Sequence, residues 1–169
     1  MVLYIFYTGK PTGKDVLKHE GKKMVKDHLT ETLELFNNGF HCSQSVFGAF
    51  SEDFGLPRET ALKISCPFGG GIGGYGRTCG ALTGALMAIG LKYASSDPSD
   101  SEAKNLTRQK SRELIELFEK EHGSSMCNDL VGFDRSHLVG AELAAKREIF
   151  HTICPKFLET AVSFLEEEL

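Results

Sequence analysis

The chain has 169 residues and a mass of 18.6 kDa, a length typical of a single domain. Its content of 41% hydrophobic and 25% charged residues is that of a globular protein and not of a disordered one. The net charge of −4 argues against a nucleic-acid-binding protein, because such proteins carry a basic face. The longest uncharged apolar stretch, Cys79 to Leu91, is too short to cross a bilayer, so no membrane partner is expected.

The first 21 residues are expected to form a tail and linker ahead of a helical domain that spans residues 22–169. The apolar run Val2 to Tyr7 lacks the basic start and the cleavage site of a signal peptide, so a cytoplasmic location is expected. This run is strand-like, and we interpret it either as a disordered tail or as a strand that pairs with a second copy in a homodimer. The segment Lys10 to Lys23, rich in Lys and Gly, is the expected linker.

Apolar residues at helical spacing, together with start and stop signals, predict helix after helix along the domain. The predicted helices are Lys22 to Asn37, Ser43 to Phe54, Pro57 to Ser65, Gly80 to Tyr93, Ser99 to before Gly123, Ala141 to Ile153, and Pro155 onward. Ser99 and Glu102 have the spacing of a capping box, and Pro155 suits the first turn of the last helix. The predicted fold is therefore all-α, a single-domain bundle of six to seven helices with a glycine-rich loop before a central helix.

The chain has five cysteines, Cys42, Cys66, Cys79, Cys127 and Cys154. Their odd number argues against a disulfide framework, and the absence of a CxxC pair argues against a zinc ribbon or a thioredoxin-type motif. If these thiols act together, the fold must bring them together.

Four of the cysteines, all except Cys66, lie at or within a residue of a predicted helix start. Unpaired N–H groups and the helix dipole favour a thiolate at such positions, and the thiolate is the form that ligates a metal or attacks a disulfide. The alternative is that each cysteine is a small buried apolar residue. Because four of the five cysteines share this position, the functional interpretation is favoured. Cys66 lies at a helix end before Pro67, so we expect it to be structural and dispensable.

Nine of the 18 glycines lie between Gly69 and Gly90. We expect the loop before Cys79 to line the cysteine site and to direct backbone N–H groups toward sulfur. The glycines assigned to this lining are Gly69, Gly70, Gly71, Gly73, Gly74 and Gly80. The alternative is that glycines such as Gly80 and Gly84 let another helix approach closely. The loop also matches GxGxxG, but no strand is predicted before it, which argues against dinucleotide binding.

Several segments together resemble the C_GCAxxG_C_C family of redox-active proteins. They are Cys42-Ser43-Gln44-Ser45-Val46, Phe68-Gly69-Gly70-Gly71, Cys79-Gly80-Ala81-Leu82-Thr83-Gly84, Cys127 and Cys154-Pro155. The resemblance runs from about Leu33 to Leu165 and implies a mostly helical fold with a thiol- or metal-centred redox role. The family's four cysteines fall on the same four residues and leave out Cys66. A similar domain, associated with an iron–sulfur centre, is fused to a haem-binding segment in split-Soret cytochromes, but this chain has no CxxCH motif for covalent haem.

Three functions remain open at this point. Cys42, Cys79, Cys127 and Cys154 are the ligands of an iron–sulfur cluster such as [2Fe–2S], or they are redox dithiols of a dithiol–disulfide oxidoreductase, or they hold zinc in a structural interaction module. His41 and His151 lie near two of these thiols, either as zinc ligands or bases or as surface and capping residues. Whether the chain is an oxidoreductase or an electron-transfer protein stays open, as does its redox partner.

Overall fold

The computed structural model describes residues 27–169, and the predicted tail, the linker and the strand-like run Val2 to Tyr7 lie outside them. Within the described residues the chain forms eight α-helices, two short 3₁₀ helices and no β-sheet, which confirms the all-α prediction. The α-helices are α1 (His28–Asn37), α2 (Cys42–Phe50), α3 (Arg58–Ser65), α4 (Gly80–Tyr93), α5 (Ser101–His122), α6 (Cys127–Val131), α7 (Gly140–Ala145) and α8 (Arg147–Glu168). The 3₁₀ helices are η1 (Ser51–Phe54) and η2 (Cys66–Phe68).

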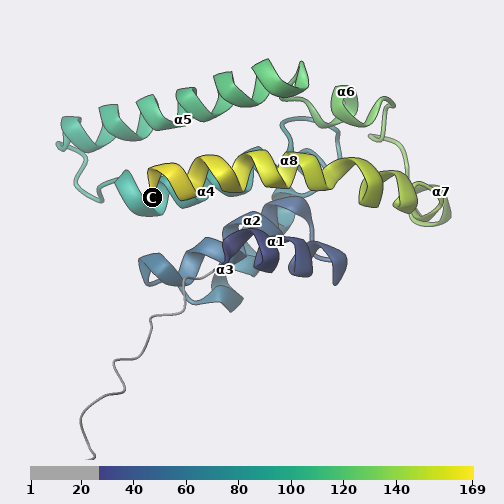
Figure 1. The fold of residues 1–169 in the computed structure, drawn as a ribbon, viewed down its shortest axis with the longest axis horizontal. Helices are drawn as coiled ribbons and strands as arrows, with labels where there is room; N and C mark the ends of the chain where they lie inside the picture. The colour runs from purple at the N-terminus through teal and green to yellow at the C-terminus, as the bar shows by residue number, and fades with distance from the viewer. Residues whose placement is uncertain (1–26) are drawn as a thin grey trace, which may run out of the picture.

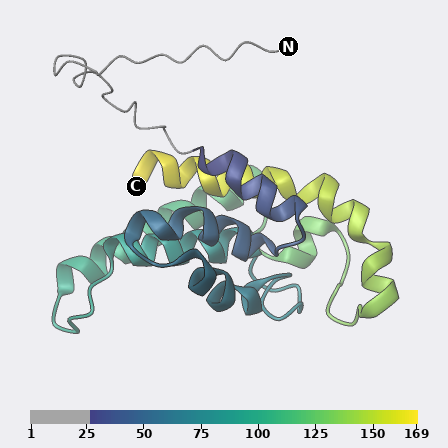
Figure 2. The same ribbon diagram turned by 90° about the horizontal axis from the view of Figure 1, so that it is seen from below.

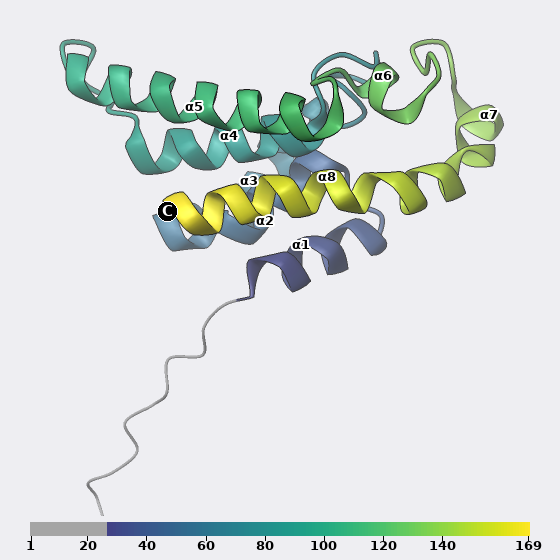
Figure 3. The same cartoon turned by 45° about the horizontal axis from the view of Figure 1, so that its top comes forward.

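Helix α4 lies at the centre of the bundle (Figure 1). It is apolar on every side, as expected of a helix surrounded by others, and its residues 80–85 are all buried. Helix α8 runs beside it and α5 covers both, while α2 packs on α4 from the other side and α1 and α3 pack on α2 (Figures 1 and 3). Figure 2 shows α1 lying along α8.

The core between these layers is built from large apolar side chains of α2, α4, α5 and α8. The largest fully buried ones are Phe50, Phe118, Leu82, Ile89, Leu114, Leu158 and Leu165. Each such side chain contributes on the order of 1.5–3 kcal/mol to the free energy of unfolding relative to an exposed position. None of the described helices is both long and apolar enough to span a membrane.

Helix α5 begins one residue later than a Ser99 cap would require. Its N-cap is Asp100, whose carboxylate accepts a hydrogen bond of 2.9 Å from the Ala103 N–H. Ser99 instead donates to Asp97 in the preceding turn. The predicted capping box is therefore wrong, whereas the predicted end is confirmed, because Gly123 terminates α5 with a left-handed φ of 81°.

The last helix differs from the prediction at Pro155. Proline does not open it but lies inside α8, which begins at Arg147 and follows the short α7. Proline lacks an N–H, so the carbonyl four residues earlier loses its partner in the helix. Apolar side chains on both sides of the proline, Phe150 and Ile153 before it and Phe157 and Leu158 after it, pack against the core and hold the helix continuous. Cys154 therefore lies mid-helix and not at a helix start.

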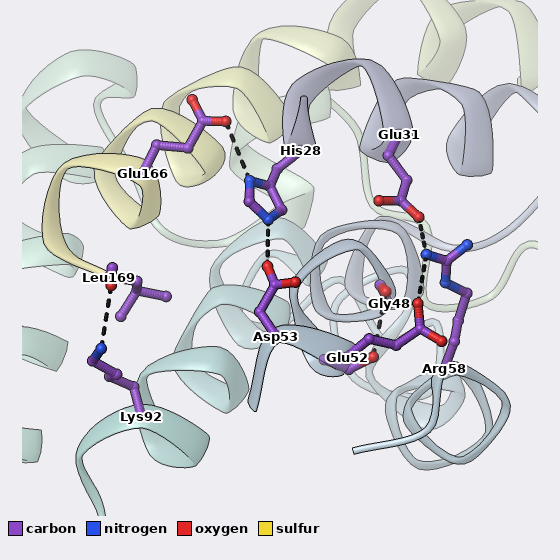
Figure 4. Close-up of polar contacts among 10 residues, drawn as sticks. His28, Glu31, Gly48, Glu52, Asp53, Arg58, Lys92, Glu166 and Leu169 are labelled. Atoms are coloured by element: carbon purple, nitrogen blue, oxygen red, sulfur yellow. Dashed lines mark hydrogen bonds and ion pairs between the residues drawn. The ribbon is translucent and has the colours of Figure 1, made fainter. Parts of the chain in front are cut away.

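A group of polar contacts joins the start of α1 to the end of α8 (Figure 4). His28 stacks on Phe50 with ring centroids 4.1 Å apart. Its Nε2 lies 2.5 Å from an Asp53 carboxylate oxygen, and its Nδ1 lies 3.5 Å from Glu166. These contacts connect α1, η1 and α8.

Candidate functional site

Four of the five cysteines line one cavity of about 560 Å³. Cys42 begins α2, Cys79 caps α4, Cys127 begins α6, and Cys154 lies in the middle of α8. Cys66, the fifth, is exposed and is not among the residues that line the cavity. The fold thus brings together four thiols that are at least 27 residues apart in the chain.

Glycines place the start of α2 against the start of α4. A Cβ added at Gly80 would lie 3.1 Å from the Cβ of Cys42, and one added at Gly84 would lie 2.7 Å from the carbonyl oxygen of Ser43. Any side chain at Gly84 would therefore force the two backbones apart. These two glycines support the close helix approach that the sequence offered as an alternative.

Polar residues after Cys42 fix its helix to the rest of the fold. The Ser43 hydroxyl donates to the carbonyl of Ser65 at 2.8 Å. The Gln44 amide donates to the carbonyl of Leu62 at 2.9 Å and accepts from the His41 N–H at 2.9 Å. Both side chains are buried, so these bonds anchor α2 to α3 and hold Cys42 in place.

A short antiparallel bridge holds Cys79 beside Cys127. The Cys79 N–H donates to the carbonyl of Ser125 at 2.8 Å, and the Cys127 N–H donates to the carbonyl of Arg77 at 2.7 Å. The last residues of the glycine loop therefore pair with the segment that enters α6. This pairing places Cys79 and Cys127 on neighbouring segments of the backbone.

The glycine loop itself contributes little of the cavity lining. Of the loop glycines only Gly70 borders the cavity, together with Gly80 of α4, whereas Gly69, Gly71, Gly73 and Gly74 do not. The six amides from Ile72 to Arg77 donate to backbone carbonyls between Pro67 and Ile72. The expectation that the loop directs its backbone N–H groups toward sulfur is therefore wrong for these six amides. Gly71 has a φ of 74°, and a Cβ there would lie 2.5 Å from the Arg77 nitrogen, so the loop needs glycine to turn.

Cys42 and Cys154 interact most directly among the thiols. The interaction between these two thiols, together with burial, raises the pKa of Cys42 well above its ordinary value, and the same interaction lowers the pKa of Cys154. Charge on Cys79 and Cys127 also raises the pKa of Cys42. All four sulfurs therefore lie within electrostatic reach of one another.

At Cys79 and Cys127, burial has a larger effect on the thiol pKa than the position at a helix start. Burial raises the pKa of Cys79 to about 12, although the Ala81 and Leu82 N–H groups in the first turn of α4 oppose this without forming a side-chain cap. Burial also raises the pKa of Cys127. The expectation that a helix start favours a thiolate is wrong for Cys42, Cys79 and Cys127. The thiol with a lowered pKa is Cys154, which lies mid-helix.

Arg135 is a cavity residue that the sequence did not point to. Its Nη1 lies 3.8 Å from the Cys127 sulfur, and its guanidinium lies over the Phe150 ring at 4.8 Å. Its positive charge opposes the effect of burial on Cys127 and helps to lower the pKa of Cys154. The Asn128 side chain accepts from the Arg135 N–H at 3.1 Å and thereby fixes this loop. No local motif marks an arginine in a loop as part of a thiol site.

The two candidate histidines both line the cavity. His41 is the N-cap residue of α2, and burial lowers its pKa, with a further contribution from the charge of Arg135. His151 lies one turn before Cys154, with its ring 5.3 Å from that of Phe36. Neither forms a hydrogen bond to a cysteine sulfur within the described residues.

Four thiols at one cavity are a donor set that metal centres use. A single zinc ion, with bonds of about 2.3 Å, requires ligand sulfurs to be nearly in contact. Among residues 27–169 no three His, Cys, Asp or Glu side chains are placed to hold one metal ion. A cluster distributes four cysteine ligands over several iron atoms, and four thiols around one cavity provide that ligand set chemically.

Comparisons with known proteins agree with the four-cysteine pattern. The family model described as "Putative redox-active protein (C_GCAxxG_C_C)" matches residues 40–168. A relative from Archaeoglobus fulgidus, described as an "Uncharacterized protein", is 36% identical over 61 residues. That match covers 36% of this chain and 40% of the relative's length. No solved structure matches the chain significantly.

Proposed function

Because the chain belongs to the C_GCAxxG_C_C family of redox-active proteins, we propose that Cys42, Cys79, Cys127 and Cys154 hold an iron–sulfur cluster. The observation that carries this proposal is the meeting of four thiols, from four separate helices, at one cavity. A dithiol enzyme needs two thiols, whereas four cysteines are the usual ligands of a cluster. When bound, such a cluster supplies one-electron transfer.

The chain's own residues have two roles in this proposal. The four thiols give up their protons when they ligate, which costs free energy at the buried Cys79 and makes loading depend on pH. Arg135 carries the positive charge nearest to Cys127 and offsets part of the negative charge of four thiolates. The glycines at the crossing of α2 and α4 keep Cys42 close to the other ligands.

A second candidate is dithiol–disulfide exchange, and the interaction between the Cys42 and Cys154 thiols at the cavity favours it. Oxidation of this pair would form one S–S bond and pass two electrons and two protons to a disulfide of a redox partner, which would become a dithiol. Cys154, with the lowered pKa, would be the attacking thiolate. A structural zinc module held by the same four thiols is the third candidate.

The proposed setting is the cytoplasm, where thiols stay reduced, with a separate redox partner that supplies or removes electrons. On the cluster hypothesis the protein is an electron-transfer protein, and on the dithiol hypothesis it is an oxidoreductase. Neither hypothesis gives a role to nucleic acid or to a membrane.

Anaerobic purification followed by reconstitution with ferrous iron and sulfide tests the proposal. We expect bound iron and acid-labile sulfide, a visible absorption band that bleaches on reduction, and loss of both when any one of the four cysteines is changed to serine. A protein that takes up no iron but shows reversible two-electron oxidation of thiols would overturn the cluster in favour of the dithiol. Cys66→Ser is the matched control.

A further inference from the structure

The cavity extends beyond the four cysteines along α8. Arg147, His151 and Cys154 all line it and are spaced by four and three residues, which places them on one helix face. Seven residues of helix correspond to about 10 Å, so Arg147, the first residue of α8, lies about that far along the helix from Cys154. At about 560 Å³ the cavity has the size of a small-molecule site, for which about 300–1,000 Å³ is usual.

Apart from the cysteine thiols, the lining of this cavity carries positively charged side chains and no carboxylate. None of the described residues that line it is Asp or Glu, although the whole chain has a net charge of −4. Arg135 and Arg147 both line it, and within residues 27–169 neither forms an ion pair. A concave site with one sign of charge attracts ligands of the opposite sign.

The two arginines differ in their surroundings. The Arg135 guanidinium lies between the Phe150 ring and the backbone of Gly70, and its charge acts on the cysteines. Its Nε is buried without a hydrogen-bond partner among the described residues. Arg147 is exposed, and its Nε contacts His151 Nε2 at 3.4 Å. Its two terminal nitrogens form no hydrogen bond to described residues, so they can receive a ligand.

Apolar side chains form a further part of the cavity lining. Phe36, Leu143 and Phe150 are among them, and Gly140, which also borders the cavity, is exposed. A ligand that fills this part therefore needs an apolar body, and its charged group must suit a guanidinium. Carboxylates and phosphates do so because they accept two parallel N–H bonds from arginine.

Building on the proposed redox function, we propose that this cavity binds a small organic anion, a carboxylate or a phosphate with an apolar body, beside the thiols. Its charged group lies on Arg147, with Arg135 at the inner end, and its apolar body lies against Phe36 and Phe150. This assigns the ligand of the redox site to the class of small organic acids.

Calorimetric titration with benzoate, phenyl phosphate and neutral benzamide at pH 7.5 tests this inference. We expect one saturable site per chain for at least one of the two anions, and binding of benzamide at least about tenfold weaker. The anion that binds more tightly tells carboxylate from phosphate. Arg147→Gln should weaken binding of that anion about tenfold or more, whereas Arg108→Gln, the same change at an exposed residue of α5, should not.

Equal affinity for the anions and benzamide would overturn the inference, as would an equal loss in the two arginine variants. Iron content and thiol oxidation, measured on the same preparations, separate this inference from the proposed function. Anion binding by a protein that shows neither cluster nor thiol chemistry would refute the proposed function and support this site. A loaded or redox-active protein that binds neither anion would refute this site alone.

Discussion

At the scale of the residue, the surroundings of each sulfur separate Cys66 from the other four cysteines. Cys66 is exposed at the end of α3 and does not line the cavity. We expect Cys66→Ser to keep the iron content and thiol titration of the wild type and to change the free energy of unfolding by less than about 0.5 kcal/mol. Cys79→Ser should lose most of the site chemistry. Metal analysis and urea unfolding measure both effects, and a loss in Cys66→Ser equal to that in Cys79→Ser would contradict the assignment.

Arg135 allows a second prediction at this scale. Its positive charge lies 3.8 Å from the Cys127 sulfur and stabilises the more negative, reduced form of the site. Arg135→Gln should therefore make reduction harder and lower the reduction potential by tens of millivolts, about 59 mV for each 1.4 kcal/mol in a one-electron couple. Redox titration of Arg135→Gln against Arg108→Gln measures this shift. An unchanged or raised potential in Arg135→Gln would show that its charge does not act on the site.

At the scale of the element, the crossing of α2 and α4 depends on glycine at one position and not at another. A Cβ at Gly84 would lie 2.7 Å from the Ser43 carbonyl oxygen, which is backbone and cannot move alone, whereas a Cβ at Gly90 meets nothing within 4 Å. Gly84→Ala should lower the free energy of unfolding by about 1–3 kcal/mol. Gly90→Ala, in the same helix, should raise it by up to about 1 kcal/mol. Urea unfolding of both variants tests this, and equal effects would refute it.

The contact between α5 and α8 gives a prediction on pH. His122 lies against Phe118 and Phe157, its Nε2 is 2.9 Å from the Thr160 hydroxyl, and burial lowers its pKa from the usual value near 6.5. The unfolded chain therefore takes up this proton first as the pH falls, and the stability that is complete above pH 6.5 is lost progressively below it. His122→Gln should show a shallower loss between about pH 7 and pH 5.

Urea unfolding across this pH range measures the effect, and His137→Gln, a change at an exposed histidine, is the control. If His122→Gln and the wild type lose stability with the same slope, another group is responsible. The comparison needs only the described helices α5 and α8, so it is independent of the redox chemistry.

The elements also show what local sequence patterns can predict. Helix α4 begins and ends at the predicted residues, Gly80 and Tyr93, because an apolar run bounded by a glycine loop leaves few alternatives. The last helix could not be predicted so well, because the rule that proline starts a helix is local. The packing of Phe157 and Leu158 against the core is not local, and it keeps α8 continuous through Pro155.

At the scale of the whole molecule, the family pattern in the sequence pointed to the four cysteines, but their chemistry depends on tertiary contacts. The bridge between Thr78 and Met126 and the crossing at Gly84 join segments that are far apart in the chain. No periodicity within a helix encodes such contacts. For the same reason the sequence could not reveal Arg135, nor the burial that raises the pKa of Cys79.

Because the four cysteines come from helices that are far apart in the chain, cluster ligation and disulfide formation should stabilise different helices. A cluster would join all four cysteines, and one of them, Cys127, lies in α6, a helix of only five residues that has little stability of its own. Cluster loading should therefore slow backbone hydrogen exchange in α6 and in the adjoining segment 132–139 as well as in α2 and α8. A disulfide between Cys42 and Cys154 would join α2 to α8 and leave exchange in α6 nearly unchanged. Hydrogen exchange measured by mass spectrometry on the reduced, the oxidised and the iron-loaded protein tells these outcomes apart. Iron loading that leaves α6 as exchangeable as in the reduced protein would show that Cys127 is not a ligand.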